Sequence, residues 1–79
     1  MKSVHSDTYK AVVQALKQAR LRAGLTQQQV AKRLGRPQSF VAKYESGERR
    51  VDVAEFIAIA RAVGAEPGRV FAAIVRKAP

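Results

Sequence analysis

The side chains in this chain that are best suited to chemistry are amides, hydroxyls, lysine and arginine, and they gather in residues 26–50. A glutamine amide can bond adenine through N6 and N7, a lysine can reach O6 or N7 of guanine, and an aromatic ring can meet a thymine methyl. Arginines pair well with phosphates. These groups favour binding to double-stranded DNA, and the candidate contact residues are Gln27, Gln28, Arg36, Gln38, Ser39, Phe40, Lys43, Arg49 and Arg50.

The same inventory argues against catalysis. His5 is the only histidine and the chain has no cysteine, so a catalytic triad or a metal cluster lacks its second member. The carboxylates Glu45, Glu48, Asp52 and Glu55 are better used as a salt-bridge partner and as helix caps. We expect no enzyme, no catalytic residue, no metal and no cofactor.

Composition agrees with a nucleic-acid partner. The 79 residues carry a formal net charge of +9, and 47% of them are hydrophobic. A chain of this length suits one domain, residues 1–79, and this much positive charge attracts polyanions. Met1 to His5 lack the apolar run of a signal peptide, and no 18-residue apolar segment could span a bilayer. We expect a cytoplasmic protein, bacterial or phage-encoded, without a membrane partner and associated with the nucleoid through DNA.

Two short helices joined by a tight turn must position the candidate contacts. Thr26 followed by Gln29 is a capping box, which predicts a helix from Gln27 to about Leu34 that ends at Gly35. The next helix is expected to have Pro37 at its first position and to end at Gly47. Phe40 or Val41, together with Tyr44, should point inward.

Three further helices should form the scaffold, so the chain is expected to be all-α. The first follows a cap at Ser6 or Asp7 and stops at Gly24. The fourth follows a capping box of Asp52 and Glu55, and the fifth spans about 67–77. The apolar stripe expected on the fourth helix consists of Val53, Phe56, Ile57, Ala60 and Val63.

The run from Gly24 to Gly35, GLTQQQVAKRLG, resembles the helix-turn-helix family of phage Cro proteins and phage repressors, also called the XRE family. Counted from Gln27, Ala31 is fifth, Gly35 ninth and Tyr44 eighteenth, the spacing that family members share. The resemblance covers roughly Leu16 to Val63. It implies a five-helix, lambda-repressor-like domain with its helix-turn-helix core at about 26–47, similar to small phage repressors and to restriction-modification controller proteins.

The resemblance also implies roles for particular residues. Gln27 looks like the family glutamine that contacts phosphate while bracing a second glutamine, here Gln38. Arg20 and Glu45 match a structural pair that joins the first helix to the end of the recognition helix. The loop that carries Arg49 and Arg50 would follow the phosphates. Phe40 remains open, because an aromatic at this position could touch a base or pack against the scaffold.

Members of this family usually bind as two-fold dimers, and the last helices carry more apolar surface than a four-helix core needs. We therefore expect a homodimer whose interface comprises Ile59, Val70, Phe71, Ile74 and Val75. The alternative is that the fifth helix completes the core of the monomer.

The expected function is a sequence-specific transcriptional regulator that occupies an inverted-repeat operator as a dimer. Two alternatives stay open. An antitoxin would use the same DNA-reading unit and also bind a toxin protein, whereas a protein-interaction adaptor would keep the helical shell without reading bases.

Overall fold

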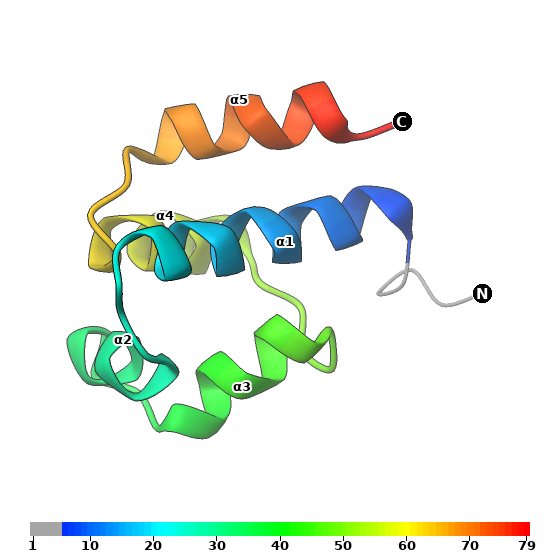
Figure 1. Ribbon diagram of the computed structural model, residues 1–79. Coiled ribbons are helices and arrows are strands. Elements are labelled where there is room, and N and C mark those ends of the chain that lie inside the picture. The colour runs from blue at the N-terminus through cyan, green and yellow to red at the C-terminus, as the bar shows by residue number, and fades with distance from the viewer. Residues whose placement is uncertain (1–5) are drawn as a thin grey trace.

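The computed structural model describes residues 6–79, and this part of the chain is all-α, without strands. Five helices follow one another along the chain (Figure 1). They are α1 (Asp7–Arg22), α2 (Gln27–Leu34), α3 (Gln38–Ser46), α4 (Val53–Ala62) and α5 (Pro67–Lys77). The bounds of α2 and α5 agree with the helices expected at 27–34 and at about 67–77.

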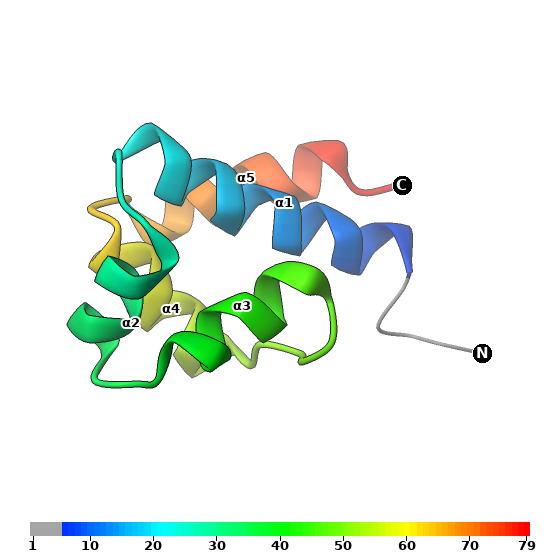
Figure 2. The ribbon, with the colours of Figure 1, turned by 60° about the horizontal axis from the view of Figure 1, so that its bottom comes forward.

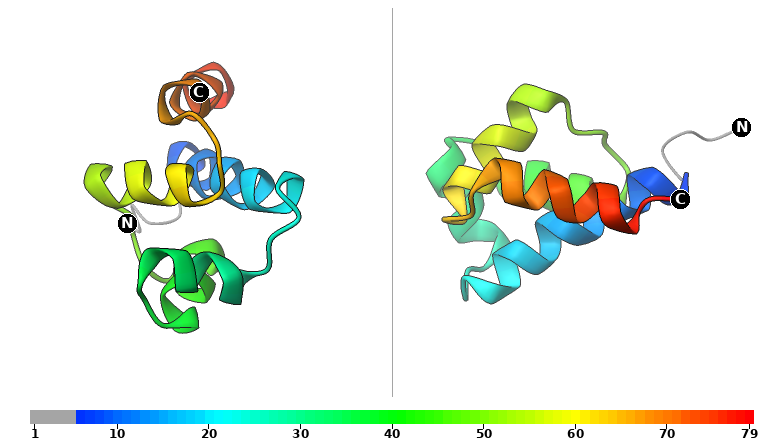
Figure 3. Two further views of the ribbon diagram at one scale, coloured as in Figure 1. Left: turned by 90° about the vertical axis from the view of Figure 1, so that its left-hand side faces the viewer. Right: turned by 90° about the horizontal axis from the view of Figure 1, so that it is seen from above.

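The helices form three layers, which are clearest when the molecule is viewed along α5 (Figure 3, left). Helices α1 and α4 lie in the middle, the α2–α3 pair lies on one side, and α5 lies on the other. Helix α1 contacts α3, α4 and α5, while α4 contacts α2 and α5. The middle layer is therefore covered on both sides, so α4 must be apolar on more than one face.

The core lies where α1, α2, α3 and α4 meet. Val30 and Val41 are fully buried, and Ala31 is 2% exposed between α2 and α3. A small side chain at Ala31 lets the two helices cross closely. The buried residues of this cluster are Leu16, Val30, Ala31, Phe40, Val41, Tyr44, Ile59 and Val63.

The helix ends follow the local signals in the sequence. The side chain of Ser6 accepts the Tyr9 N–H and caps α1. Both capping boxes are complete, Thr26 with Gln29 before α2 and Asp52 with Glu55 before α4. Gly35 has a φ of 67°, a left-handed value that other residues rarely adopt, and it ends α2 at the turn into α3.

The start of α3 differs from the expectation. Pro37 has an extended ψ of 154° and is the residue before the helix, so Gln38 is the first helical residue. The Phe40 N–H bonds the Pro37 carbonyl, which closes the first turn. Proline fits this position as well because its ring fixes only φ.

Two expectations for α4 were wrong. Val53, placed on the apolar stripe, is 76% exposed, because it opens the helix and lies outside the core. Ile59, placed at a dimer interface, is 1% exposed and belongs to the monomer core. The expected apolar stripe assumes that α4 packs against a single neighbour. In the structure α4 also lies between α2 and α5, so its buried face is wider and includes Ile59.

Helix α5 is likewise divided between two roles. Ile74 is 4% exposed and Val70 packs against the core, so both help to complete the monomer. Ile74 was expected in the dimer interface, but its side chain is buried within the monomer. Phe71 and Val75 are 58% and 57% exposed and remain on the outer face of the helix.

A buried ion pair joins α1 to the end of α3. The Arg20 Nε donates to Glu45 Oε2 at 2.7 Å, and a second guanidinium nitrogen donates to Oε1 at 3.0 Å. The remaining nitrogen donates to the Leu25 carbonyl at 2.8 Å. Their side chains are 11% and 3% exposed, and the hydrogen bonds that Arg20 donates to Glu45 raise the Arg20 pKa above its usual value. This pair confirms the partnership that the resemblance implied.

We expect Glu45→Ala to lower the free energy of unfolding by about 3 kcal/mol, because it leaves the Arg20 cation buried without its counter-ion. Urea denaturation followed by circular dichroism measures this change. Glu48→Ala is the matched control, since Glu48 is exposed and forms no ion pair among residues 6–79. Equal stability losses for the two variants would show that the pair has no structural role.

Candidate nucleic-acid interface

The exposed face of α3 carries a short row of polar side chains. Gln38, Ser39 and Lys43 are all exposed, and Ser39 and Lys43 lie one helical turn apart. The opposite face of the same helix places Val41 and Tyr44 in the core. The helix is therefore held by one side and offers amide, hydroxyl and ammonium groups on the other, at the edge of the molecule that Figure 2 brings forward.

Helix α2 presents its first turn beside α3. Gln28 is exposed, whereas Gln27 is partly buried and its Nε2 donates to Glu45 Oε1 at 3.0 Å. The expected bracing of Gln38 by Gln27 is absent from the described residues, and Gln27 is instead tied to the Arg20–Glu45 pair. An ionised carboxylate can accept several hydrogen bonds, so Glu45 accepts the Gln27 amide in addition to its bonds from Arg20.

Phe40 belongs to the scaffold. Its side chain is 8% exposed, and its ring meets the Tyr44 ring edge to face with 5.4 Å between centroids. Of the two roles left open for Phe40, these contacts support packing against the scaffold. The following residue, Val41, is also buried, so Phe40 and Val41 lie on the inward side of α3 while Ser39 and Lys43 lie on the exposed side.

Two arginines cover the Phe40 ring. The Cζ atoms of Arg36 and Arg49 lie 4.1 and 4.8 Å from the ring centroid, within the range of cation–π attraction. Arg36 precedes α3 and Arg49 follows it, so the ring brings together cations from the two ends of this helix. Phe40 therefore positions charged groups beside the polar row although it is itself buried.

Glu55 holds the same two arginines, a role that the sequence did not reveal. Arg49 donates to both Glu55 oxygens at 2.9 Å, and Arg36 donates to Oε2 at 3.2 Å. The carboxylate also accepts the Asp52 N–H, which is its function in the capping box. The hydrogen bonds from Arg49, and next that from Asp52, lower the Glu55 pKa from 4.5 to about 2. Only the cap could be foreseen, since Arg36 is distant in sequence.

Tyr9 anchors the loop after α3. Its hydroxyl donates to the Arg49 carbonyl and accepts the Val51 N–H, both at 3.1 Å. The Arg50 Cζ lies 4.6 Å from the centre of the Tyr9 ring. A buried aromatic residue of α1 thus holds the two expected phosphate-contacting arginines in place, and only long-range packing could identify it.

The arrangement of exposed polar and basic groups suits polyanion binding. Among residues 6–79 no group of three or more His, Cys, Asp or Glu side chains could hold a metal ion. In the same part of the chain, no helix is long and apolar enough to cross a membrane. The exposed polar row of α3 is flanked by Arg36, Arg49 and Arg50, so hydrogen-bonding groups and cations share one edge of the molecule.

Solved structures that resemble this chain have the same architecture. The XRE-family like protein from Pseudomonas syringae pv. tomato str. DC3000 shares 44% sequence identity, with a TM-score of 0.85 over 91% of this chain and 88% of that chain. The restriction-modification controller protein C.AhdI from Aeromonas hydrophila shares 31% identity, with a TM-score of 0.69 over 77% and 92%. The controller protein C.Esp1396I, at 18% identity, has a TM-score of 0.84 over 92% and 94%, a likeness of fold.

Among curated protein sequences, no significant match was found. A family model described as a helix-turn-helix domain matches residues 11–73, which span most of the chain from α1 to α5. Together with the 44% identity to an XRE-family like protein, this match shows that the chain belongs to the XRE family of helix-turn-helix proteins.

Proposed function

We propose that this protein is a transcriptional regulator that binds operator DNA in a sequence-specific manner. The observation that carries the proposal is the exposed row of Gln38, Ser39 and Lys43 on a helix whose other face is buried. A helix held in this way can enter the major groove and place these groups against base edges. Two of the similar structures are described as restriction-modification controller proteins, which supports a regulatory role.

Binding to the DNA backbone would come from groups around that helix. Arg36, Arg49 and Arg50 lie in the segments before and after α3, and the first turn of α2 offers Gln28 and backbone N–H groups. Gln27, held by Glu45, would keep this turn in register with α3. The net charge of +9 would add long-range attraction to DNA.

The active species is proposed to be a homodimer that pairs through α5. Phe71 and Val75 lie one turn apart on the helix and are the exposed large apolar residues of α5. A two-fold axis near them would present two copies of α3 to an inverted repeat. Regulation would then follow protein concentration, with occupancy of the operator repressing or activating transcription.

Selection of bound sequences from a random duplex pool tests the function. We expect enrichment of an inverted repeat, because two copies of α3 read the same half-site in opposite orientations. Lys43→Ala should relax the preference at one position of each half-site by about 1 to 3 kcal/mol. Lys32→Ala, on the exposed surface of α2, is the control and should leave the preference unchanged. No enrichment with the parent protein would remove the proposal.

Glu55→Gln tests the role of the Arg36–Glu55–Arg49 cluster in DNA binding. Glutamine can keep the cap, as Gln29 does in the equivalent position of α2, but it removes the negative charge that the arginines share. We expect tighter binding to random-sequence DNA and a salt dependence steeper by about one in log K against log salt. Glu48→Gln, with the same charge change and no ion-pair partner among residues 6–79, should have little effect. Equal changes in both variants would contradict the role.

The effect of Glu55→Gln on stability should depend on pH in the acid range. The Glu55 pKa in the folded protein is about 2, below its usual 4.5, so its contribution to stability is present above pH 4.5. This contribution is lost as the pH falls from 4.5 toward 2. The stability difference between the parent and Glu55→Gln should therefore shrink across this window in urea denaturation. A difference that is constant with pH would show that the ion pairs do not stabilise the fold.

Phe71→Ser tests the dimer. We expect the parent to sediment as a dimer at micromolar concentration and the variant to sediment as a monomer with unchanged helix content. Phe71 also meets the Phe56 ring edge to face at 6.4 Å, so Val75→Ser provides a second variant without this contact. Ala72→Ser, at an exposed neighbouring position, is the control. A monomeric parent would exclude the α5 dimer.

A further inference from the structure

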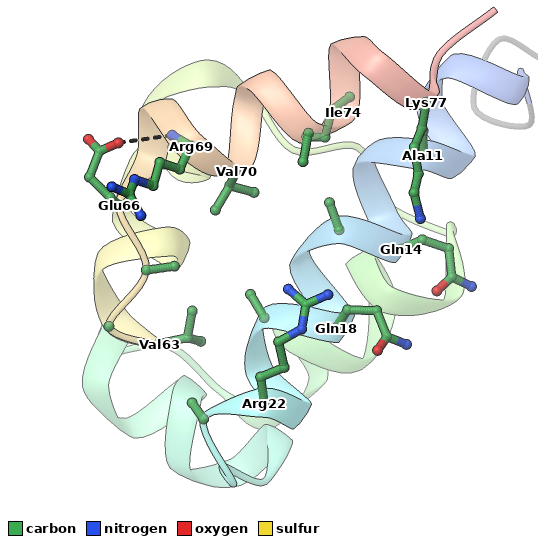
Figure 4. A pocket seen from close by; sticks show the side chains of 16 residues that line it. Ala11, Gln14, Gln18, Arg22, Val63, Glu66, Arg69, Val70, Ile74 and Lys77 are labelled. Atoms are coloured by element: carbon green, nitrogen blue, oxygen red, sulfur yellow. Dashed lines mark hydrogen bonds between the residues drawn. The ribbon is translucent and has the colours of Figure 1, made fainter.

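A wide groove of about 790 Å³ runs between α1 and α5 (Figure 4). It lies on the side of α1 away from α3, since α5 and the α2–α3 pair occupy opposite outer layers (Figures 1 and 3). None of the proposed DNA contacts lines it, and neither do Phe71 and Val75. The groove is therefore separate from both surfaces used by the proposed function.

The floor of the groove is apolar and made largely of small side chains. On α1 it is lined by Ala11, Ala15 and Ala19, which repeat every four residues and so share one face of the helix. On α5, Val70 and Ile74 form the facing wall. Alanines leave room for bulkier apolar side chains from another molecule, and the backbone of that molecule could approach closely.

The rim of the groove is basic, and its cations are unused. Arg22, Arg69 and Lys77 make no ion pair among residues 6–79, and their side chains form no hydrogen bond there. Glu66 is the one carboxylate of the lining, and it accepts the Arg69 N–H at 2.9 Å as the cap of α5. Near α3, by contrast, Arg49 is paired with Glu55. The rim thus carries three cations against one carboxylate, which leaves an excess of positive charge.

We propose that this groove binds an acidic, amphipathic helical segment of a different protein. Its apolar side chains would lie on the alanine floor, and its carboxylates would pair with the three rim cations. Charge complementarity selects this occupant. A second copy of the chain carries 15 Lys and Arg against 6 Asp and Glu, so it offers few carboxylates to pair with the rim. Duplex DNA would satisfy the rim but has no apolar side chains for the floor.

Because the groove and the polar row of α3 lie on opposite sides of the molecule, the segment could bind while α3 contacts DNA. The chain would then connect a DNA site to an acidic protein partner. This inference concerns a second binding surface, and it holds whether or not α3 reads a specific operator.

Fluorescence anisotropy with a labelled synthetic peptide tests the proposal. The probe is a peptide of about 15 residues with leucines at i, i+4, i+7 and i+11, glutamates at i+1, i+5 and i+8, and alanines elsewhere, a pattern that favours an amphipathic helix. We expect saturable binding to the full chain below about 1 mM and at least a tenfold loss of affinity in the double variant Arg22→Gln, Arg69→Gln. Arg61→Gln on the exposed side of α4 is the control and should bind like the parent. Melting curves verify that each variant is folded.

Amide chemical shifts of the labelled protein locate the bound peptide. We expect changes at Ala15 and Ala19, and at Ala73 of α5, which also lines the groove, and none along the exposed face of α3. Equal binding of a peptide with lysines in place of glutamates would overturn the proposal, as would absence of saturation. Shift changes at these alanines upon adding duplex DNA would assign the groove to nucleic acid, and a change of oligomeric state in the double variant would assign it to a second copy.

Discussion

The orientation of α3, with its exposed polar row, depends on the buried pair of Arg20 and Glu45. One carboxylate accepts two bonds from α1 and a third from Gln27 of α2, while Arg20 also donates to the carbonyl of Leu25. Three helices and the loop between two of them thus share one polar cluster. A buried charge is costly without its partners, so other orientations of α3 are disfavoured. Tyr44, beside Glu45, is buried at the same junction, and desolvation raises its pKa well above the usual value.

Glu55 shows how one side chain can serve both local and tertiary structure. Gln29 and Glu55 occupy the same position in two capping boxes, and each accepts the N–H of its cap residue. Only the carboxylate attracts cations, so Glu55 also gathers Arg36 and Arg49 around the Phe40 ring. The basic groups near α3 are therefore held in fixed places, whereas the cations along the α1–α5 groove remain unpaired within the described residues.

The differences between expectation and structure share a cause. Val53, Ile59 and Ile74 were assigned from helical periodicity, which reports that a helix has an apolar face but not how many neighbours it has. Helix α4 packs against α1, α2 and α5, and α5 completes the monomer, so residues expected at a surface are buried and Val53 is exposed. Phe40 shows the same limit, because its inward direction depends on Tyr44 and on the two arginines.

The sequence by itself determined the helices, their caps and the turn at Gly35, because hydrogen bonds between near neighbours and the left-handed freedom of glycine are local properties. It also indicated the Arg20–Glu45 pair and the polar row of α3 through the resemblance to a known family. Only the tertiary structure decided that Phe40 is buried, that Glu55 binds two arginines, that Tyr9 holds the loop after α3, and that α1 and α5 together line a groove. These features join residues far apart in the chain, and their energies exist only once the helices have packed.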